Sequence, residues 1–318
     1  MKLLSRSLAL LLAGALFFGA IGLVLTWAPD VPVEQLKVRW ATPPSRFIEV
    51  NGMQVHVRDE GPHNDPAPIV LLHGTSASLH TWEGWAQALR DKRRVIRFDL
   101  PGFALTGPNR QGDYSTAAYV TFVRGVMDKL GVQRFVIGGN SLGGQIAWSV
   151  AAAMPDRVDR LILVDASGYP PESFSEKRSV PLGFRIATTP GVRWIMQYTL
   201  PRGVVERSVR NVYGDPSKVT PELVDLYMDM TRREGNRDAL ARRFEQGFTA
   251  DVSLLKKITV PTLILWGGKD KLVPLAAGQR FAKDIANSKL VVYEDLGHVP
   301  QEEDPARTVA EVRRFLAS

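Results

Sequence analysis

The sequence predicts an α/β fold in which a mostly parallel central sheet is flanked by helices. Short apolar runs of strand length alternate with amphipathic stretches of helix length over most of the chain. The apolar runs are nearly continuous, as in strands that are buried on both faces. Before them, an Asn51-Gly52 pair separates two alternating runs, which is a strong signal for a β-hairpin.

Six apolar runs define the expected parallel strands. They are Ile69–Leu72, Val95–Phe98, Phe135–Ile137, Leu161–Val164, Thr262–Leu265 and Leu290–Tyr293. The expected helices are Trp82–Leu89, Thr116–Leu130, Gly144–Ala153, Ala276–Ala286 and Ala306–Leu316. The last helix follows Asp304-Pro305, where an aspartate can cap the helix and a proline fits the first helical position.

The alternation of strands and helices stops once, between the fourth and fifth of these runs. Residues 169–252 contain no convincing strand, several prolines and helix-like stretches. We therefore expect a helical cap over residues 169–252, inserted into a core formed by residues 46–168 and 253–318. Apolar cap residues that could line a substrate pocket, or simply pack the cap onto the core, include Phe184, Trp194 and Met196.

The N-terminus predicts a membrane-spanning helix. Leu8 to Trp27 is free of charged residues for a length that can cross a bilayer, and Lys2 and Arg6 precede it. The positive-inside rule then places the domain that follows this helix outside the cytoplasm, on the periplasmic or extracellular side. A cleaved signal peptide is the alternative for residues 1–28, and it predicts the same side. Residues 29–45, with Pro32, Pro43 and Pro44, are expected to form a linker.

Composition excludes several classes of function. The chain has no cysteine, so disulfides, thiolate metal sites and a cysteine nucleophile are excluded. The net charge of +7 could favour an anionic lipid surface, but basic and acidic residues are interspersed, as on an ordinary solvated surface. No nucleic-acid-binding module is recognisable, so we expect no nucleic-acid partner.

Gly139-Asn140-Ser141-Leu142-Gly143 fits the G-x-S-x-G pattern between an expected strand and an expected helix. A sharp turn in this context presents the serine hydroxyl at the edge of the sheet, and the helix N-terminus favours a developing negative charge. Ser141 is therefore the candidate nucleophile.

A serine hydroxyl needs a base, and the base needs an acid to orient it. His298 follows the last expected strand and shares the carboxyl edge of the sheet with Ser141. Asp270 follows the preceding strand and is the candidate acid, and Asp165 is a rival on the same edge. His56 and His63 are expected at the surface, while His73 is expected to shape the loop that it begins. Asp99 is expected to order the loop below the site.

Hydrolysis through a tetrahedral intermediate also requires donors for the oxyanion. We expect the backbone N–H of Leu142, directly after the nucleophile, and that of Thr75, in the loop after the first parallel strand.

With these motifs, the chain resembles the α/β-hydrolase superfamily of serine hydrolases, in the branch with a helical cap. The matching motifs are His73-Gly74, Asp99-Leu100-Pro101-Gly102-Phe103, Gly139 to Gly144, Gly267-Gly268-Lys269-Asp270 and Gly297-His298-Val299-Pro300. Relatives that hydrolyse epoxides or haloalkanes use an aspartate where this chain has Ser141. Relatives that cleave carbon–carbon bonds often carry a glycine-rich stretch after His-Gly and a Trp after the catalytic His, where this chain has Thr75 and Val299.

The resemblance implies hydrolysis of a carboxylic ester through an acyl-enzyme, without a metal or an organic cofactor. An apolar cap favours a substrate with a hydrophobic acyl or alcohol part, and a membrane anchor favours a lipid-like ester. A carbon–carbon hydrolase, a lactonase, an amidase or a perhydrolase could use the same triad. A membrane-anchored binding module with a silent site is the alternative outside enzymes. The sequence does not determine the oligomeric state.

Overall fold

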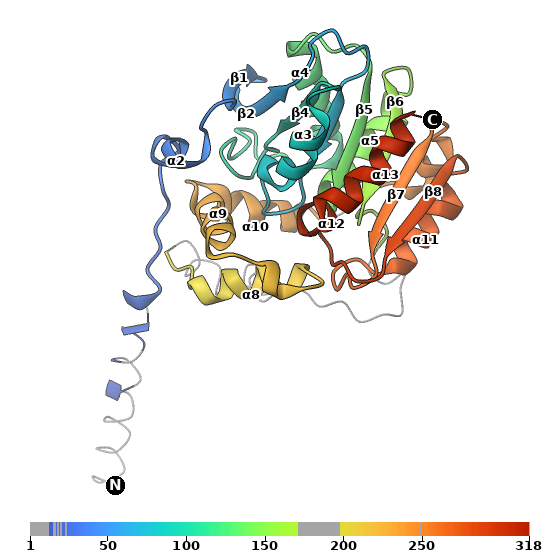
Figure 1. Cartoon of the computed structure of the whole chain (residues 1–318). Coiled ribbons are helices and arrows are strands. Elements are labelled where there is room, and N and C mark those ends of the chain that lie inside the picture. Colours follow the sequence, from blue (N-terminus) through green and yellow to red (C-terminus); the bar gives the residue numbers. More distant parts are fainter. Residues whose placement is uncertain are drawn as a thin grey trace.

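The structure is a computed structural model that describes residues 13–14, 17, 19, 21–22, 24–170, 198–247 and 250–317. Its centre is an eight-stranded sheet, within the described residues, in the order β1-β2-β4-β3-β5-β6-β7-β8 (Figure 1). The strands are β1 (Arg46–Val50), β2 (Met53–Glu60), β3 (Ile69–Leu72), β4 (Val95–Phe98), β5 (Phe135–Asn140), β6 (Val158–Val164), β7 (Thr262–Gly267) and β8 (Ser288–Tyr293). The two pairings that involve β2 are antiparallel, and all others are parallel. The predicted hairpin, the six predicted strands and the mostly parallel sheet are confirmed.

Helices cover both faces of the sheet. Two of them, α3 (Glu83–Leu89) and α13 (Pro305–Ala317), pack together on one face, where Trp85 Nε1 donates a hydrogen bond to Thr308 Oγ1 at 2.9 Å. The other face is covered by α4 (Thr116–Lys129), α5 (Leu142–Ala153) and α11 (Leu275–Asp284). Asp304 Oδ1 accepts a hydrogen bond from the N–H of Arg307, as expected for an aspartate that caps the last helix.

The described part of the expected cap is helical. Its elements are α8 (Arg202–Val212), the 3₁₀ turn η3 (Pro216–Lys218), α9 (Pro221–Arg232) and α10 (Asn236–Gln246). They lie beyond the carboxyl ends of the strands (Figure 1). Phe184, Trp194 and Met196, the expected pocket residues, lie outside the described residues.

The segment before the hairpin contains structure that the sequence analysis did not predict. Helix α2 (Val33–Trp40) lies within the expected linker and packs beside α9. Arg39 Nη2 pairs with Asp225 at 3.1 Å, and Trp40 Nε1 donates to Asp229 at 2.9 Å. These contacts attach the segment to the cap.

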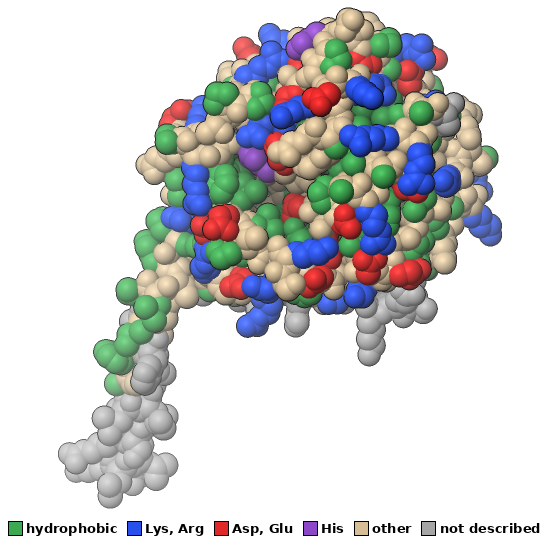
Figure 2. Space-filling model, in the orientation of Figure 1, with side chains coloured by type: hydrophobic (Ala, Val, Ile, Leu, Met, Phe, Trp, Pro, Cys, Tyr) green, Lys and Arg blue, Asp and Glu red, His purple; other side chains and the backbone are tan. Residues whose placement is uncertain are grey.

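Half of the expected membrane-spanning stretch, Leu8 to Trp27, lies outside the described residues. In the part that the structure covers, no helix is both long and apolar enough to cross a bilayer. The described residues at the end of that stretch nevertheless expose hydrophobic side chains, including Val24 (74%), Leu25 (79%) and Trp27 (54%). On the face seen in Figure 2, Lys and Arg side chains alternate with Asp and Glu side chains, as the interspersed sequence predicts.

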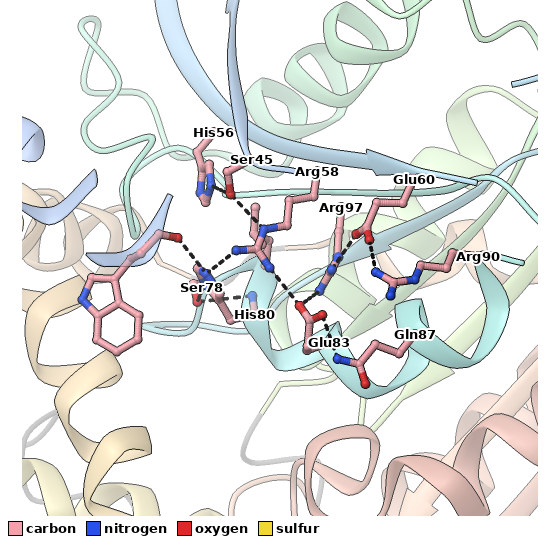
Figure 3. A network of polar contacts seen from close by, with 12 residues as sticks. Ser45, His56, Arg58, Glu60, Ser78, His80, Glu83, Gln87, Arg90 and Arg97 are labelled. Carbon is pink, nitrogen blue, oxygen red and sulfur yellow. Dashed lines mark hydrogen bonds and ion pairs between the residues drawn. The ribbon is translucent and has the colours of Figure 1, made fainter. Parts of the chain in front are cut away.

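A network of polar side chains joins the hairpin, β4 and the start of α3 (Figure 3). Arg97, which is fully buried, donates to Glu83 at 2.8 Å and to Glu60 at 2.6 Å. Arg58 donates to the same Glu83 carboxylate at 2.9 Å. Charged groups are buried here, and the guanidinium groups of Arg97 and Arg58 each pair with a carboxylate, as burial of an ion requires. Arg58 Nε also donates to Ser45 Oγ at 2.8 Å.

The prediction that His56 lies at the surface was wrong. Its side chain is fully buried by residues that pack on it, among them Ser45, whose Oγ lies 2.8 Å from His56 Nε2. His56 Nδ1 donates to Asp99 Oδ2 at 2.7 Å, and its ring stacks on Phe47 at 5.2 Å between centroids. Burial by itself would raise the pKa of Asp99. The charge and the hydrogen bond of His56 outweigh this effect and lower the pKa to about 2. His63 is exposed, as predicted.

Because His80 is buried with a low pKa, we expect the stability of the protein to fall at acid pH. The His80 Nε2–H donates to the Trp40 carbonyl at 3.0 Å, and burial lowers the pKa of His80 from 6.5 to about 4. In the unfolded chain the same ring takes up a proton near 6.5, so this contribution to stability is present above that pH and is lost as the pH falls to about 4. We expect wild type to lose on the order of 3 kcal/mol more than the His80→Gln variant over this range, measured by urea unfolding at a series of pH values. The exposed His63→Gln variant is the control and should follow wild type. Parallel curves for all three proteins would contradict this role of His80.

Candidate active site

Ser141 lies in a sharp turn between β5 and α5. Its backbone has φ 53° and ψ −115°, in a region that non-glycine residues rarely adopt. The Ser141 N–H donates to the Val164 carbonyl at 3.1 Å, which fixes the turn against the end of β6. The side chain is half-buried at the carboxyl edge of the sheet, in the position that the sequence predicts.

Glycines make this turn possible. A Cβ on Gly139 would lie 2.1 Å from the Gly143 carbonyl oxygen, and one on Gly143 would lie 2.2 Å from the Leu72 carbonyl oxygen. Both distances are far below contact, so the backbone after β5 packs directly on neighbouring backbone. Leu142 is the first residue of α5, where the N–H groups have no partner within the helix.

The loop after β3 lies against Ser141. A Cβ on Gly74 would be 3.2 Å from Ser141 Cβ. The Ala77 N–H donates to the Gly74 carbonyl at 3.2 Å and Ser76 has φ 61°, so Thr75 is the second residue of a type II turn. His73 shapes this loop, as predicted: its Nδ1–H donates to the Gly74 carbonyl at 2.8 Å, and its Nε2 accepts from the Leu100 N–H at 2.9 Å.

His298 and Asp270 meet at the same edge. His298 Nδ1 donates to Asp270 Oδ2 at 2.7 Å, and the His298 side chain is 5% exposed. Because Nδ1 carries the proton in this contact, Nε2 of the neutral ring is an acceptor. The other Asp270 oxygen accepts the N–H groups of Leu272 and Val273 at 2.7 and 3.1 Å. Asp270 is therefore a fixed, fully buried acceptor.

Asn140, which the sequence analysis did not single out, connects the serine turn to the histidine loop. Its side-chain amide donates to the Val164 carbonyl at 3.1 Å and to the His298 carbonyl at 2.9 Å. The predicted residues therefore come together on one edge, although they are far apart in the sequence. Asp99 lies outside this group and orders loops by accepting the N–H groups of Leu79 and Leu105 at 2.8 and 3.0 Å.

Ser167 and Glu303 were also missed as site residues. Ser167 Oγ lies 3.5 Å from Ser141 Oγ, and the Ser167 N–H donates to the Ser141 carbonyl at 3.0 Å. Glu303 is buried and accepts the N–H groups of Gly297 and Gly214 at 2.8 and 2.9 Å. Ser167 follows the end of β6, and this position could have marked it as a residue of the same edge.

Among the described residues, three side chains of this site could be considered as ligands of a metal ion. Asp165, Asp270 and His298 offer ligand atoms that lie within 4.8 Å of one another. The Nδ1–H of His298 already donates to Asp270, so this nitrogen is not available as a ligand in that state. The geometry instead fits a histidine that is oriented by a carboxylate.

Comparisons with known proteins agree on the family. Residues 69–312 match the model of the alpha/beta hydrolase family. The uncharacterized hydrolase YugF of Bacillus subtilis is 29% identical over 87% of this chain and 99% of its own. The 2-hydroxymuconate semialdehyde hydrolase of Pseudomonas putida is 30% identical over 86% of this chain and 94% of its own. The crystal structure of a membrane phospholipase A superposes with a TM-score of 0.74 at 25% identity, covering 100% of this chain and 98% of the other.

The glycines of the turn allow a direct test. We expect Gly143→Ala to lower the free energy of unfolding by more than about 3 kcal/mol or to prevent folding, because the new methyl group meets backbone rather than a flexible side chain. Gly203→Ala in α8 is the matched control, since nothing lies within 4 Å of its added Cβ. It should leave stability unchanged or raise it by at most about 1 kcal/mol, measured by chemical denaturation. Equal effects of the two substitutions would contradict the close packing of this turn.

Proposed function

Because the chain belongs to the alpha/beta hydrolase family, we propose that it is a serine hydrolase that cleaves carboxylic esters with a hydrophobic acyl or alcohol part. One observation carries the proposal. A buried His298–Asp270 pair at 2.7 Å lies on the same edge of the sheet as Ser141, whose strained turn presents its hydroxyl there. This arrangement supports nucleophilic catalysis by a serine with a histidine base.

In the proposed reaction, Ser141 Oγ attacks the ester carbonyl carbon while His298 Nε2 takes the hydroxyl proton. Asp270 keeps the Nδ1–H tautomer and stabilises the imidazolium ion that forms. The tetrahedral intermediate collapses as His298 returns the proton to the alcohol oxygen, which leaves as the alcohol. Water, deprotonated by His298, then attacks the acyl-enzyme and releases the acid and the free serine.

We assign the stabilisation of the oxyanion to hydrogen bonds from the backbone N–H groups of Leu142 and Thr75. The Leu142 N–H is at the N-terminus of α5, where the helix dipole adds positive potential. The Thr75 N–H belongs to the type II turn packed against Ser141. Two preorganised donors at the site of developing charge are each worth about 100- to 1000-fold in rate.

A lipid-like ester is the proposed substrate class, with the protein attached to a membrane through its N-terminal segment. The charge-free run from Leu8 to Trp27 and the exposed Val24 and Leu25 support the attachment. The likeness to a membrane phospholipase A over the whole chain supports both the lipid-like substrate and the attachment to a membrane. With Lys2 and Arg6 on the cytoplasmic side, the catalytic domain is proposed to lie outside the cytoplasm.

Carbon–carbon bond hydrolysis is the second candidate. It is favoured by the relative from Pseudomonas putida, named 2-hydroxymuconate semialdehyde hydrolase, at 30% identity. In this chain Thr75 and Val299 occupy the places where the sequence analysis expects a glycine and a tryptophan in such enzymes. These two departures are the reason for preferring ester hydrolysis.

A series of p-nitrophenyl esters from acetate to long-chain acyl groups tests the proposal. We expect the purified full chain to hydrolyse medium and long acyl chains with a higher kcat/KM than acetate, because hydrophobic burial favours the longer chain by about 0.8 kcal/mol per CH₂. Ser141→Ala should lower kcat by at least about 1000-fold and abolish labelling by a fluorophosphonate probe. Ser167→Ala is the matched control, because it removes a neighbouring hydroxyl but keeps the nucleophile, and it should still be labelled.

The other outcomes separate the alternatives. Equal or exclusive activity on acetate would contradict a lipid-like preference. Release of an acid from a ring-fission product such as a 2-hydroxy-6-oxo-dienoate, without ester hydrolysis, would favour the carbon–carbon hydrolase. A folded protein that the probe does not label would favour a binding module with a silent site.

A further inference from the structure

A second buried carboxyl group lies beside the His298–Asp270 pair. Asp165 directly follows β6, is fully buried, and has ligand-capable atoms within 4.8 Å of Asp270 and His298. Its backbone has φ 44°, in the left-handed region that few non-glycine residues adopt. The proposed mechanism does not use this residue.

We propose that Asp165 is a positioning residue that carries a proton at neutral pH and donates it in a hydrogen bond to the Asp270 carboxylate. This inference rests on the proposed function, in which Asp270 orients His298. It extends the proposed triad by one residue, so that the order is Ser141, His298, Asp270 and Asp165.

The hydrogen-bond partners of the two carboxyl groups show which one is neutral. Asp270 accepts three hydrogen bonds, two from backbone N–H groups and one from His298. Asp165 accepts one, from the Gly267 N–H to Oδ1 at 2.9 Å. Its Oδ2 is buried and has no partner among the described residues, while one oxygen of Asp165 and one of Asp270 lie within 4.8 Å of each other. Donors stabilise a carboxylate, so the negative charge stays on Asp270 and the proton on Asp165 Oδ2.

The surrounding charges lead to the same assignment. The ionisable groups that face Asp165 are Asp270 after β7, His298 after β8, and Glu303 in α12 (Pro300–Glu303). Glu303 is also satisfied by backbone, since it accepts N–H groups from Gly297, Gly214 and Asp215. If Asp165 were a third carboxylate in this buried space, its Oδ2 would have no donor and it would have two like charges as neighbours. Burial, followed by the negative charge of Asp270, raises the pKa of Asp165 well above its usual range.

A protonated Asp165 changes what Asp270 does to His298. A hydrogen bond donated to Asp270 draws electron density from that carboxylate and holds it in one orientation. The carboxylate then stabilises the imidazolium ion less strongly, so the acid limb of the pH profile should lie at lower pH with this hydrogen bond than without it. An ionised Asp165 would have the opposite effect, because a second negative charge would stabilise the imidazolium ion and move the acid limb to higher pH.

The Asp165→Asn and Asp165→Ala variants separate these two states. The amide of Asn can accept the Gly267 N–H and donate an N–H to Asp270, so it reproduces the neutral acid. We expect Asp165→Asn to keep kcat/KM within about 3-fold of wild type and to leave the acid limb of its pH profile in place. Asp165→Ala should lower kcat/KM by about 10- to 100-fold, the effect of one lost hydrogen bond to a charged group, and should move the acid limb to higher pH.

Infrared spectroscopy tests the protonation without any turnover. At neutral pH, the difference spectrum between wild type and Asp165→Asn should contain the C=O stretch of a protonated carboxylic acid. Asp65→Asn is the control, because Asp65 is ionised. Burial by itself would raise the pKa of Asp65, but the hydrogen bond from Arg93 outweighs this effect, so that the pKa lies below its usual value. Its difference spectrum should show loss of carboxylate bands only.

Each outcome supports or overturns the assignment. An acid limb that moves to lower pH in Asp165→Asn, or a missing acid band, shows that Asp165 is ionised. Loss of activity in Asp165→Ala with an unmoved acid limb shows a purely structural role and overturns the positioning role. If neither wild type nor the Asp165 variants hydrolyse any ester, the proposed function fails. The infrared band still decides whether Asp165 carries a proton.

Discussion

The close approach of backbone around Ser141 is the constraint on which the site depends. The turn has a positive φ, and the Ser141 N–H is held by the Val164 carbonyl at 3.1 Å. Such a turn can exist only because Gly139 and Gly143 have no Cβ where neighbouring carbonyl oxygens lie about 2 Å from the ideal Cβ position. Strain at one residue is thus held in place by the packing of strands on both sides, and the hydroxyl is directed to the rim where the His298 loop arrives.

Much of the fold follows from local signals in the sequence. The Asn51-Gly52 pair places the hairpin, and continuous apolar runs place the parallel strands because both faces of this sheet are covered. Helix α2 could not be predicted in the same way. Its eight residues bury only Leu36, and the helix is held by contacts between Arg39, Trp40 and acidic residues of α9 that are more than 180 positions away. His56 was misplaced for a related reason, since it is buried by contacts with Asp99 and Ser45, which come together with it only in the folded chain.

The candidate site shows the same contrast between residues that local signals indicate and residues that depend on distant contacts. Motif and chain order indicate Ser141, Asp270 and His298 as candidates, because each lies in a connection after a strand of the mostly parallel sheet. The roles of Asn140, Ser167 and Glu303 do not follow from the motifs in the same way. These residues act through distances to residues far away in sequence, such as the 2.9 Å contact from the Asn140 amide to the His298 carbonyl. The sequence therefore indicates the candidate site residues better than it indicates the side chains that hold them in place.

The supporting contacts also join the site to the rest of the chain. The His298 N–H donates to the Val212 carbonyl at the end of α8 at 2.7 Å, so the histidine loop is bonded directly to the cap. The cap is bonded in turn to the segment before α2: the Ala28 N–H donates to the Tyr198 carbonyl at 2.8 Å, and Asp30 pairs with Arg237 at 2.6 Å. A cap that moved as a whole would therefore have to break or carry with it the hydrogen bonds of both the histidine loop and the N-terminal segment. In this fold, the position of the proposed base depends on the cap as much as on the sheet.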